Sequence, residues 1–144
     1  RAIPMSSKLG LSYITLRTID FDRQLRFYRD GFGFRLKQLY RDPDDDKRSY
    51  AFFDLNGLTL ALYPQEALAA DSGTETATAA ATGIALSHNV ATRGEVDGLL
   101  NTLQTEGGQL TRPATSLSWG GYGGYLVDPG GNLWEIVWSA TRQG

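Results

Sequence analysis

The sequence of 144 residues lacks cysteine altogether and has a single histidine, His88. The absence of cysteine excludes disulfides, thiolate nucleophiles, iron–sulfur clusters and zinc held by cysteine. A metal centre made by one chain could use at most one imidazole plus carboxylates, which argues against zinc or iron sites with two or three histidines. A Ser-His-Asp triad would depend on His88 alone.

Long apolar runs and an excess of positive charge are also missing. No stretch approaches the ~18–20 uninterrupted apolar residues of a membrane span, and no basic segment followed by an apolar one opens the chain. Fourteen basic against sixteen acidic side chains give a net charge of −2, so no positive field would attract nucleic acid. We expect a cytoplasmic protein of one compact domain, with neither nucleic acid nor a membrane among its partners.

What the chain does contain is an internal repeat. Residues 12–63 and 84–138 follow one order of predicted elements, a strand, a helix and three strands. This order predicts an α+β fold of two βαβββ modules in tandem. The strands are predicted at residues 12–18, 34–40, 49–55 and 58–63 in the first module, and at 84–90, 109–112, 122–127 and 132–138 in the second.

Each predicted helix has its own start signal. Asp20 is the expected N-cap of a helix over residues 21–29, and Thr92 with Glu95 forms a capping box that opens a helix reaching residue 103. Equivalent positions in the two halves differ by 72 residues up to the helix and by 74 at the last strand. A duplication with one small insertion explains this difference.

The rest of the chain is divided by composition. The acidic run at residues 42–46 lacks the glycine and the distal glutamate of a calcium loop, so we interpret it as a hairpin tip. The expected boundaries are an amino-terminal tail at 1–10 in which 1–4 look like a cloning remnant, the first module at 11–63, a solvated linker with at most one helical turn at 64–83, the second module at 84–138 and a carboxyl-terminal tail at 139–144.

Two segments carry a family resemblance. Residues 14–34 (ITLRTIDFDRQLRFYRDGFGF) and 128–138 (DPGGNLWEIVW) resemble the vicinal oxygen chelate superfamily, the group of glyoxalase I, bleomycin-resistance proteins and extradiol dioxygenases. The resemblance covers nearly all of residues 11–138. It implies that curved mixed sheets form a cupped cavity with the helices outside, and that two chains pair as a homodimer.

The resemblance also identifies the positions that hold a divalent ion in metal-dependent members. They fall on Tyr13, Ala61, Ala85 and Glu135 of this chain. Alanine has no donor atom, and a neutral phenol is a poor ligand for magnesium, zinc or nickel. We therefore expect no cofactor. A metal site completed by His88 with Glu135, with ligands from a second chain, is the alternative.

Strand alternation predicts which side chains face the cavity. It directs His88 toward the helix layer, where we expect a hydrogen-bonded histidine. The glycine-rich segment at 118–125 should bring at least one of its aromatic rings to a ligand, whereas Trp134 and Trp138 should lie in the core. The predicted ligand-binding residues, in a cavity between the modules, are Tyr13, Thr15, Arg17, Thr59, Tyr63, Ser87, Asn89, Trp119, Tyr122 and Tyr125.

The family resemblance, together with these residues, implies three alternative functions. The first is metal-independent binding of a small organic molecule, planar or antibiotic-like, as in bleomycin-resistance proteins. The second is a metal-free lyase, isomerase or hydrolase in which Glu135 is the general base and Arg17, Asn89 or Tyr13 stabilises developing negative charge. In place of this catalytic role, Glu135 could form an ion pair with Arg17 across the cavity. The third is a metal-dependent lyase or dioxygenase with His88 and Glu135 as ligands.

Overall fold

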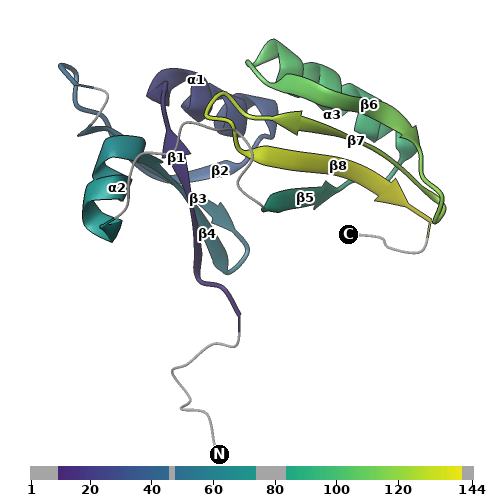
Figure 1. The fold of residues 1–144 in the computed structure, drawn as a ribbon, viewed down its shortest axis with the longest axis horizontal. Helices are drawn as coiled ribbons and strands as arrows, with labels where there is room; N and C mark the ends of the chain where they lie inside the picture. The colour runs from purple at the N-terminus through teal and green to yellow at the C-terminus, as the bar shows by residue number, and fades with distance from the viewer. Residues whose placement is uncertain (1–9, 46–47, 74–83, 141–144) are drawn as a thin grey trace, which may run out of the picture.

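The computed structural model describes residues 10–45, 48–73 and 84–140, which form two four-stranded sheets in tandem (Figure 1). The strand order is β1-β4-β3-β2 in the first sheet and β5-β8-β7-β6 in the second. In each sheet the first strand of the module pairs parallel with the last, and the other pairs are antiparallel. The α+β fold of two βαβββ modules is therefore confirmed.

The elements follow the predicted order, with one additional helix between the modules. The first module consists of β1 (Tyr13–Thr18), α1 (Phe21–Arg26), the π-helix η1 (Phe27–Gly31), β2 (Arg35–Tyr40), β3 (Tyr50–Leu55) and β4 (Leu58–Pro64). Helix α2 (Gln65–Ser72) comes next. The second module consists of β5 (Ala85–Asn89), α3 (Arg93–Thr105), β6 (Gln109–Ser116), β7 (Gly121–Val127) and β8 (Leu133–Ser139).

The pairing of β1 with β4 and of β5 with β8 follows the internal repeat of the sequence. Tyr13 pairs with Thr59 in the first sheet, and Ala85 pairs with Leu133 in the second. Ala85 follows Tyr13 by 72 residues (85 − 13 = 72), and Leu133 follows Thr59 by 74 residues (133 − 59 = 74). These are the two offsets found between the halves of the sequence. The two sheets thus have the same register, and equivalent positions face equivalent sides.

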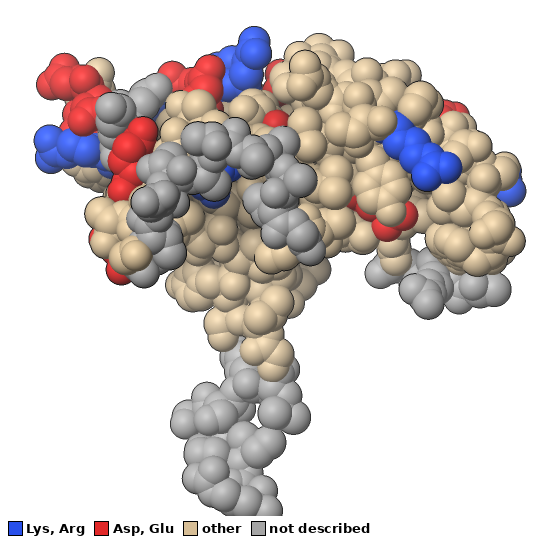
Figure 2. All heavy atoms as spheres, in the orientation of Figure 1, with Lys and Arg blue, Asp and Glu red and all other residues tan. Residues whose placement is uncertain are grey.

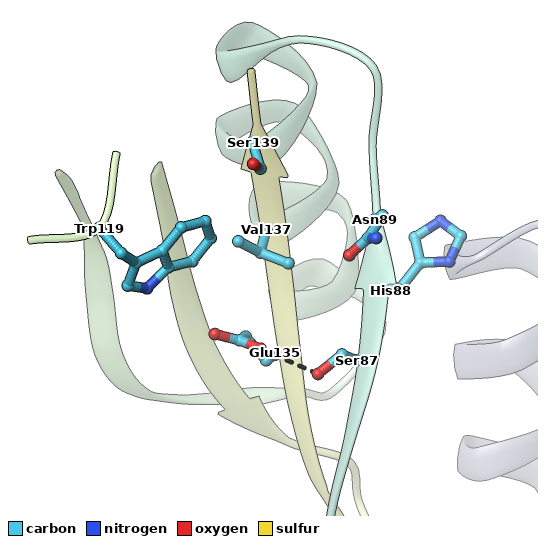
Figure 3. Close-up of a pocket in the computed structure, with 7 residues that line it drawn as sticks. All are labelled: Ser87, His88, Asn89, Trp119, Glu135, Val137 and Ser139. Carbon is cyan, nitrogen blue, oxygen red and sulfur yellow. Dashed lines mark hydrogen bonds between the residues drawn. The ribbon is translucent and has the colours of Figure 1, made fainter. Parts of the chain in front are cut away.

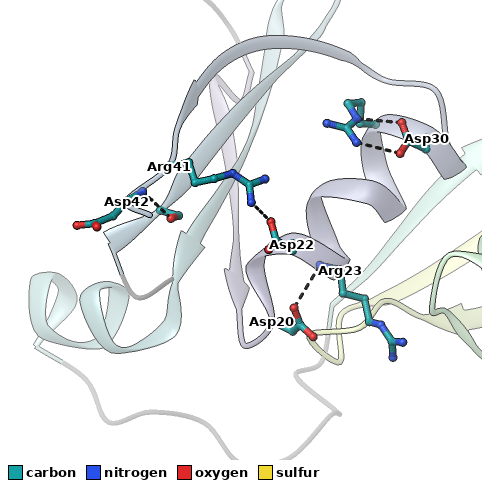
Figure 4. Close-up of polar contacts among 8 residues, drawn as sticks. Asp20, Asp22, Arg23, Asp30, Arg41 and Asp42 are labelled. Carbon is teal, nitrogen blue, oxygen red and sulfur yellow. Dashed lines mark hydrogen bonds and ion pairs between the residues drawn. The ribbon is translucent and has the colours of Figure 1, made fainter. Parts of the chain in front are cut away.

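Both predicted helix caps are present. The Asp20 carboxylate accepts a hydrogen bond from the backbone N–H of Arg23 at 3.2 Å (Figure 4). At α3, Thr92 Oγ1 accepts from the Glu95 N–H at 3.1 Å, while the Glu95 carboxylate accepts from the Ala91 N–H at 2.8 Å. These bonds satisfy backbone donors that have no partner inside the helix.

Removing the α3 cap should have a modest effect. We expect Thr92→Ala to lower the free energy of unfolding by about 1 kcal/mol, because the Glu95 N–H loses its acceptor. Chemical denaturation measures this change. Thr102→Ala, which removes an exposed hydroxyl from the same helix, is the control and should change stability by less than half as much. Equal losses in both variants would contradict the capping role.

The two modules share one core. Tyr28, on η1, is fully buried and packs against Phe53 of the first module and Trp134 of the second. Its hydroxyl donates to the Asp128 carboxylate at 2.6 Å and accepts from Trp134 Nε1 at 3.0 Å. Phe32 lies against the Trp134 ring at 4.6 Å between centroids. The two segments that carry the family resemblance therefore make the joint between the modules.

Several element boundaries differ from the sequence prediction. The helix predicted over 21–29 is α-helical only as far as Arg26 and continues as the π-helix η1. The linker contains the eight-residue helix α2 instead of one turn, and residues 74–83 lie outside the described residues. Strand β6 extends to Ser116, beyond the predicted 109–112, because two register shifts interrupt its alternation.

Charged side chains gather over α1 and the β2–β3 hairpin, at the upper left of Figure 2. Arg41 pairs with Asp22 (Figure 4), and Arg48 lies 3.2 Å from Asp42. The described part of the acidic run, up to Asp45, is the loop between β2 and β3, as expected of a hairpin tip. Among the described residues, no helix is long and apolar enough to cross a membrane.

Candidate functional site

A pocket of about 430 Å³ lies on the open face of the second sheet, away from the shared core (Figure 3). Its walls come from adjacent strands β5 and β8 and from the turn between β6 and β7. A volume of this size is within the ~300–1,000 Å³ range of small-molecule sites. The lining residues are Ser87, His88, Asn89, Trp119, Glu135, Val137 and Ser139.

Strand register aligns polar side chains in a row across the second sheet. Ser87 pairs with Glu135, Glu135 with Tyr125, and Tyr125 with Arg112. Residues paired in this way share a face, so hydroxyl, carboxylate, phenol and guanidinium groups follow one another. The predicted contributions of Ser87, Glu135 and Tyr125 to one face are therefore brought together by pairing of β5, β8 and β7.

The Glu135 carboxylate is the electrostatic centre of this row. Ser87 Oγ donates to Glu135 Oε1 at 2.9 Å, which fixes the carboxylate beside β5 (Figure 3). Burial, followed by the adjacent Glu135 charge, raises the pKa of the Tyr125 phenol. Tyr125 therefore remains a protonated hydrogen-bond donor at neutral pH.

Trp119 forms the side of the pocket opposite β5. It belongs to the tight turn between β6 and β7, in which Gly120 has a φ of +100°. The ring lies over Gly121, where an added Cβ would come within 2.7 Å of Cζ3 of Trp119. The side chain is 56% exposed and points toward Glu135 and Val137 (Figure 3). An open aromatic face is thus held next to a carboxylate.

Tyr122 lies on the other face of the second sheet, in contrast to its predicted place in the cavity. Its hydroxyl donates to Asp97 of α3 at 2.8 Å, and Arg93 lies over its ring at 5.5 Å. The hydrogen bond to Asp97 is the main cause that raises the pKa of Tyr122. Since Tyr122 and Tyr125 are three residues apart on one strand, alternation requires them to face opposite sides. The predicted core position of Trp138 is confirmed beside Tyr122, because Arg93 covers both rings.

The predicted residues of the first module lie on a separate sheet. Tyr13 is 56% exposed, with its ring edge-on to Phe52 at 6.3 Å. Thr59, its partner in register, is buried and accepts a hydrogen bond from Lys37 at 3.4 Å. Neither residue lines the pocket on the second sheet. The predicted cavity residues are thus divided, because Tyr13 and Thr59 lie on the first sheet whereas the pocket that contains Glu135 lies on the second.

Thr15 and Arg17 contribute to another hollow, of about 250 Å³, beside β1. Leu68 of α2 and Leu133 at the start of β8 complete much of its wall. This hollow is smaller and largely apolar, and it shares none of its lining with the pocket that contains Glu135. Thr15 and Arg17 therefore both line this hollow, whereas Ser87 lines the pocket that contains Glu135.

Arg17 does not form the predicted pair with Glu135. Its Nε donates to the Gly130 carbonyl at 3.2 Å, whereas the Glu135 carboxylate accepts from the Ser87 hydroxyl on the second sheet. Tyr63 is also engaged elsewhere, because its hydroxyl donates to Asp71 of α2 at 2.8 Å. That hydrogen bond is the main cause that raises the pKa of Tyr63.

His88 faces away from the Glu135 carboxylate. It touches the edge of the pocket, but its ring points to the opposite side of β5 (Figure 3). There it packs edge-on against Phe32 at 5.4 Å and Phe34 at 6.1 Å. The helix-side orientation predicted from alternation is confirmed, but the ring makes contacts with aromatic side chains instead of the expected hydrogen bond. His88 and Glu135 therefore do not converge on one metal position within this chain.

His88 should make stability depend on pH. Burial lowers its pKa below 6.5, so between these two values the unfolded chain binds more protons than the native one. Stability should therefore rise as the pH increases through the lowered pKa toward 6.5. The single histidine signal in an NMR titration gives the native pKa, and denaturation at each pH gives the stability. His88→Gln should flatten the slope in this window, and an unchanged slope would contradict the assignment.

The residues at the family's metal positions do not fit a divalent ion. Ala61 and Ala85 carry no donor atom, and Tyr13 offers only a phenol on the other sheet. Among the described residues, no group of three or more His, Asp or Glu side chains could share one ion. Glu135 is the one carboxylate of the set. Its carboxylate accepts a hydrogen bond from Ser87.

Three residues at or beside the site were not predicted from the sequence. Arg112 belongs to a strand whose register shifts hide its alternation. Ser139 was placed in the carboxyl-terminal tail, although it is the last residue of β8. Gly121 has no side chain, and the Trp119 ring packs over it only because of the geometry of the turn. The Trp-Gly-Gly sequence was the one available signal for that packing.

Comparison with protein families matches residues 10–136 to the model of the Glyoxalase/Bleomycin resistance protein/Dioxygenase superfamily. This match spans most of the chain and includes both modules. A search of the curated proteins found no match.

Solved structures show the same fold. A glyoxalase-related enzyme from Fulvimarina pelagi is 36% identical, with a TM-score of 0.77 over 90% of this chain and 88% of that one. A glyoxalase/bleomycin resistance protein/dioxygenase family enzyme from Burkholderia phytofirmans PsJN is 24% identical, with a TM-score of 0.70 over 90% and 98% of the two chains. A lactoylglutathione lyase from Agrobacterium tumefaciens is 23% identical, with a TM-score of 0.62 over 94% and 95%.

Proposed function

Because the chain belongs to the Glyoxalase/Bleomycin resistance protein/Dioxygenase superfamily, we propose that it binds a small planar organic molecule, without a metal, on the open face of its second sheet. The observation that carries this proposal is the Trp119 ring, held over Gly121 and pointing toward Glu135. A flat ligand can stack on the indole while its polar edge meets the carboxylate.

The charge of the pocket favours a particular kind of planar ligand. Glu135 is the one acid among the described lining residues, and neither Lys nor Arg lines the pocket. Asn89 adds an amide and Ser87 a hydroxyl on the same side. A ligand with a positive charge or N–H donors at its edge would satisfy Glu135, and its ring would gain cation–π attraction from Trp119.

A second copy of the chain completes the site in this proposal, as the family resemblance implies. The open face of the first sheet carries adjacent aromatic rings, with Tyr40 stacked on Tyr50 at 5.2 Å and Tyr50 against Phe52 at 5.6 Å. Tyr13 and Tyr40 are 56% and 44% exposed. Such a face would cover a planar ligand on the second sheet of a partner and exclude water from it.

Native mass spectrometry tests metal independence and pairing together. The protein is analysed as purified and after incubation with manganese, iron, nickel and zinc, with elemental analysis of each sample. We expect a dimer with no stoichiometric metal. One ion per chain would overturn the metal-independent proposal, and a monomer at micromolar concentration would overturn the shared site.

Ligand binding is tested with proflavine, a planar cation, alongside uncharged and anionic planar compounds. We expect proflavine to bind most tightly of the three charge types and to quench indole fluorescence. Glu135→Gln should weaken proflavine by about tenfold, because the charge attraction is lost, and should affect the uncharged compound much less. Absence of binding by every planar compound would contradict the proposal.

Proton transfer is a second candidate function, favoured by the polar row of Ser87, Glu135 and Tyr125 across the second sheet. Ser87 positions the Glu135 carboxylate as a base, and the protonated Tyr125 beside it can donate to a developing oxyanion. This function predicts slow exchange of an acidic C–H proton of a bound carbonyl compound with deuterated water. Glu135→Gln should abolish the exchange while leaving the fold intact, and exchange at the parental rate would remove Glu135 from this role.

A further inference from the structure

A second hollow lies on the opposite side of β5, where the core shared by the modules opens to solvent. This inter-module cleft has a volume of about 430 Å³ and runs between the β3–β4 turn of the first module and β5 of the second. It contains neither Trp119 nor Glu135, although Ser87 and His88 of β5 line both this cleft and the Glu135 pocket. Its apolar lining includes Ile14, Phe34, Leu58, Leu60, Leu86 and Trp134.

Besides Asn56 and Ser87, the polar side chains of the cleft are Arg35, Asp54 and His88, which lie at different depths. Arg35 and Asp54 form an ion pair of 3.4 Å, with the Arg35 side chain 82% exposed, so these charges belong to the rim. His88 is half-buried and lies on the wall formed by β5. Among the described residues, it is the one titratable side chain of the cleft besides that rim pair.

The His88 ring is held in place by apolar contacts alone. Phe32 and Phe34 pack edge-on to it at interplanar angles of 85° and 71°. No hydrogen bond within the described structure uses its nitrogens. Burial lowers its pKa, so the ring is neutral at neutral pH and offers one N–H donor and one nitrogen acceptor. A polar group aimed at an apolar cleft, without a partner, is suited to a ligand hydroxyl.

We propose that the inter-module cleft is a second binding site, for an uncharged aromatic molecule with one hydroxyl group that hydrogen-bonds to His88. The apolar wall supplies burial for the ring, and Trp134 and Phe34 supply aromatic contact. A charged ligand is excluded from the interior, because no opposite charge lies below the rim. The proposal does not depend on the function assigned to the pocket at Glu135.

The probe is 2-naphthol, measured by calorimetry and by NMR of the full chain. Because the chain has one histidine, the imidazole signal reports this site without further assignment. We expect saturable binding that shifts the His88 signal and leaves the Trp119 indole signal in place. Naphthalene, which lacks the hydroxyl, and naphthalene-2-sulfonate, which carries a charge, should each bind at least about tenfold more weakly.

Variants separate this site from the other pocket. Leu58→Trp fills the cleft and should abolish binding of 2-naphthol, whereas Leu39→Trp, on an exposed part of β2, should leave it unchanged. His88→Phe keeps the aromatic packing and should weaken binding by about tenfold, and His88→Gln should restore part of it. Circular dichroism confirms that each variant is folded.

Three results would overturn the proposal. They are no binding at millimolar 2-naphthol, equal binding by the parent and Leu58→Trp, and a shift of the Trp119 signal without a shift of the His88 signal. Proflavine binding is measured on the same samples. Its retention in Leu58→Trp would show that a failure of the cleft leaves the function proposed for the Glu135 pocket intact.

Discussion

Asp128→Ala should lower the free energy of unfolding by about 3–5 kcal/mol, a large part of the ~5–15 kcal/mol of an ordinary domain. Asp128 is 2% exposed and joins the two modules. Its carboxylate accepts from the Tyr28 hydroxyl at 2.6 Å and from the backbone N–H groups of Gly130 and Asn132 at 2.9 and 2.7 Å. Alanine would leave two buried donors and the partly buried Asn132 N–H without their acceptor.

The hydrogen bonds also explain why a carboxylate is tolerated in the core. Burial raises the pKa of Asp128, while the donors from Tyr28, Asn132 and Gly130 lower it. The donors thus compensate part of the desolvation of the charged form. Removing one of them should be far less harmful than removing the shared acceptor.

Urea denaturation of three proteins checks this expectation. Tyr28→Phe removes one donor and should cost about 1–2 kcal/mol, less than half of the loss in Asp128→Ala. Pro129→Ala, at the adjacent turn position, serves as the control for a local change in the loop. A loss below 1 kcal/mol in Asp128→Ala would show that water replaces the carboxylate and that the network does not hold the modules together.

Sequence reasoning succeeded where the information is local. Asp20 and Thr92 cap their helices as expected, because a cap depends on a side chain and the next three residues. The orientation of Ser87, His88 and Asn89 also followed from alternation, since β5 is short and has no bulge. Local signals therefore identified both the second sheet and the half of the site that β5 supplies.

The predictions that were wrong, for Tyr122 and Tyr13, depend on strand register and on the placement of the two sheets. In β7, glycines occupy positions 121, 123 and 124, so no apolar alternation shows which face Tyr122 takes. Pairing with Glu135 assigns that face to Tyr125 instead. Alternation also orients side chains within a sheet only. It could not show that Tyr13 lies outside the pocket that contains Glu135.

Gly121→Ala should weaken the binding of proflavine as strongly as Trp119→Ala does, by about 30-fold or ~2 kcal/mol. A methyl group on Gly121 would lie 2.7 and 2.8 Å from Cζ3 and Cζ2 of Trp119, so the indole ring could no longer pack over residue 121. The backbone of Gly121 is not in the left-handed region, and Trp119 is 56% exposed. The ring can therefore swing into solvent, and stability should change little.

A double-mutant cycle separates this effect from a general disturbance of the β6–β7 turn. If Gly121 acts only by letting the Trp119 ring pack over it, the variant with both Gly121→Ala and Trp119→Ala should bind proflavine no more weakly than either single variant. Each single change already removes the contact between Trp119 and the ligand. Additive losses would mean that Gly121 contributes independently, for example by allowing the ligand to approach the backbone. Gly120→Ala is unsuitable as a control, since its φ of +100° would strain any side chain. Thr115→Ala, on the adjacent strand and outside the pocket lining, is the matched control and should retain parental affinity.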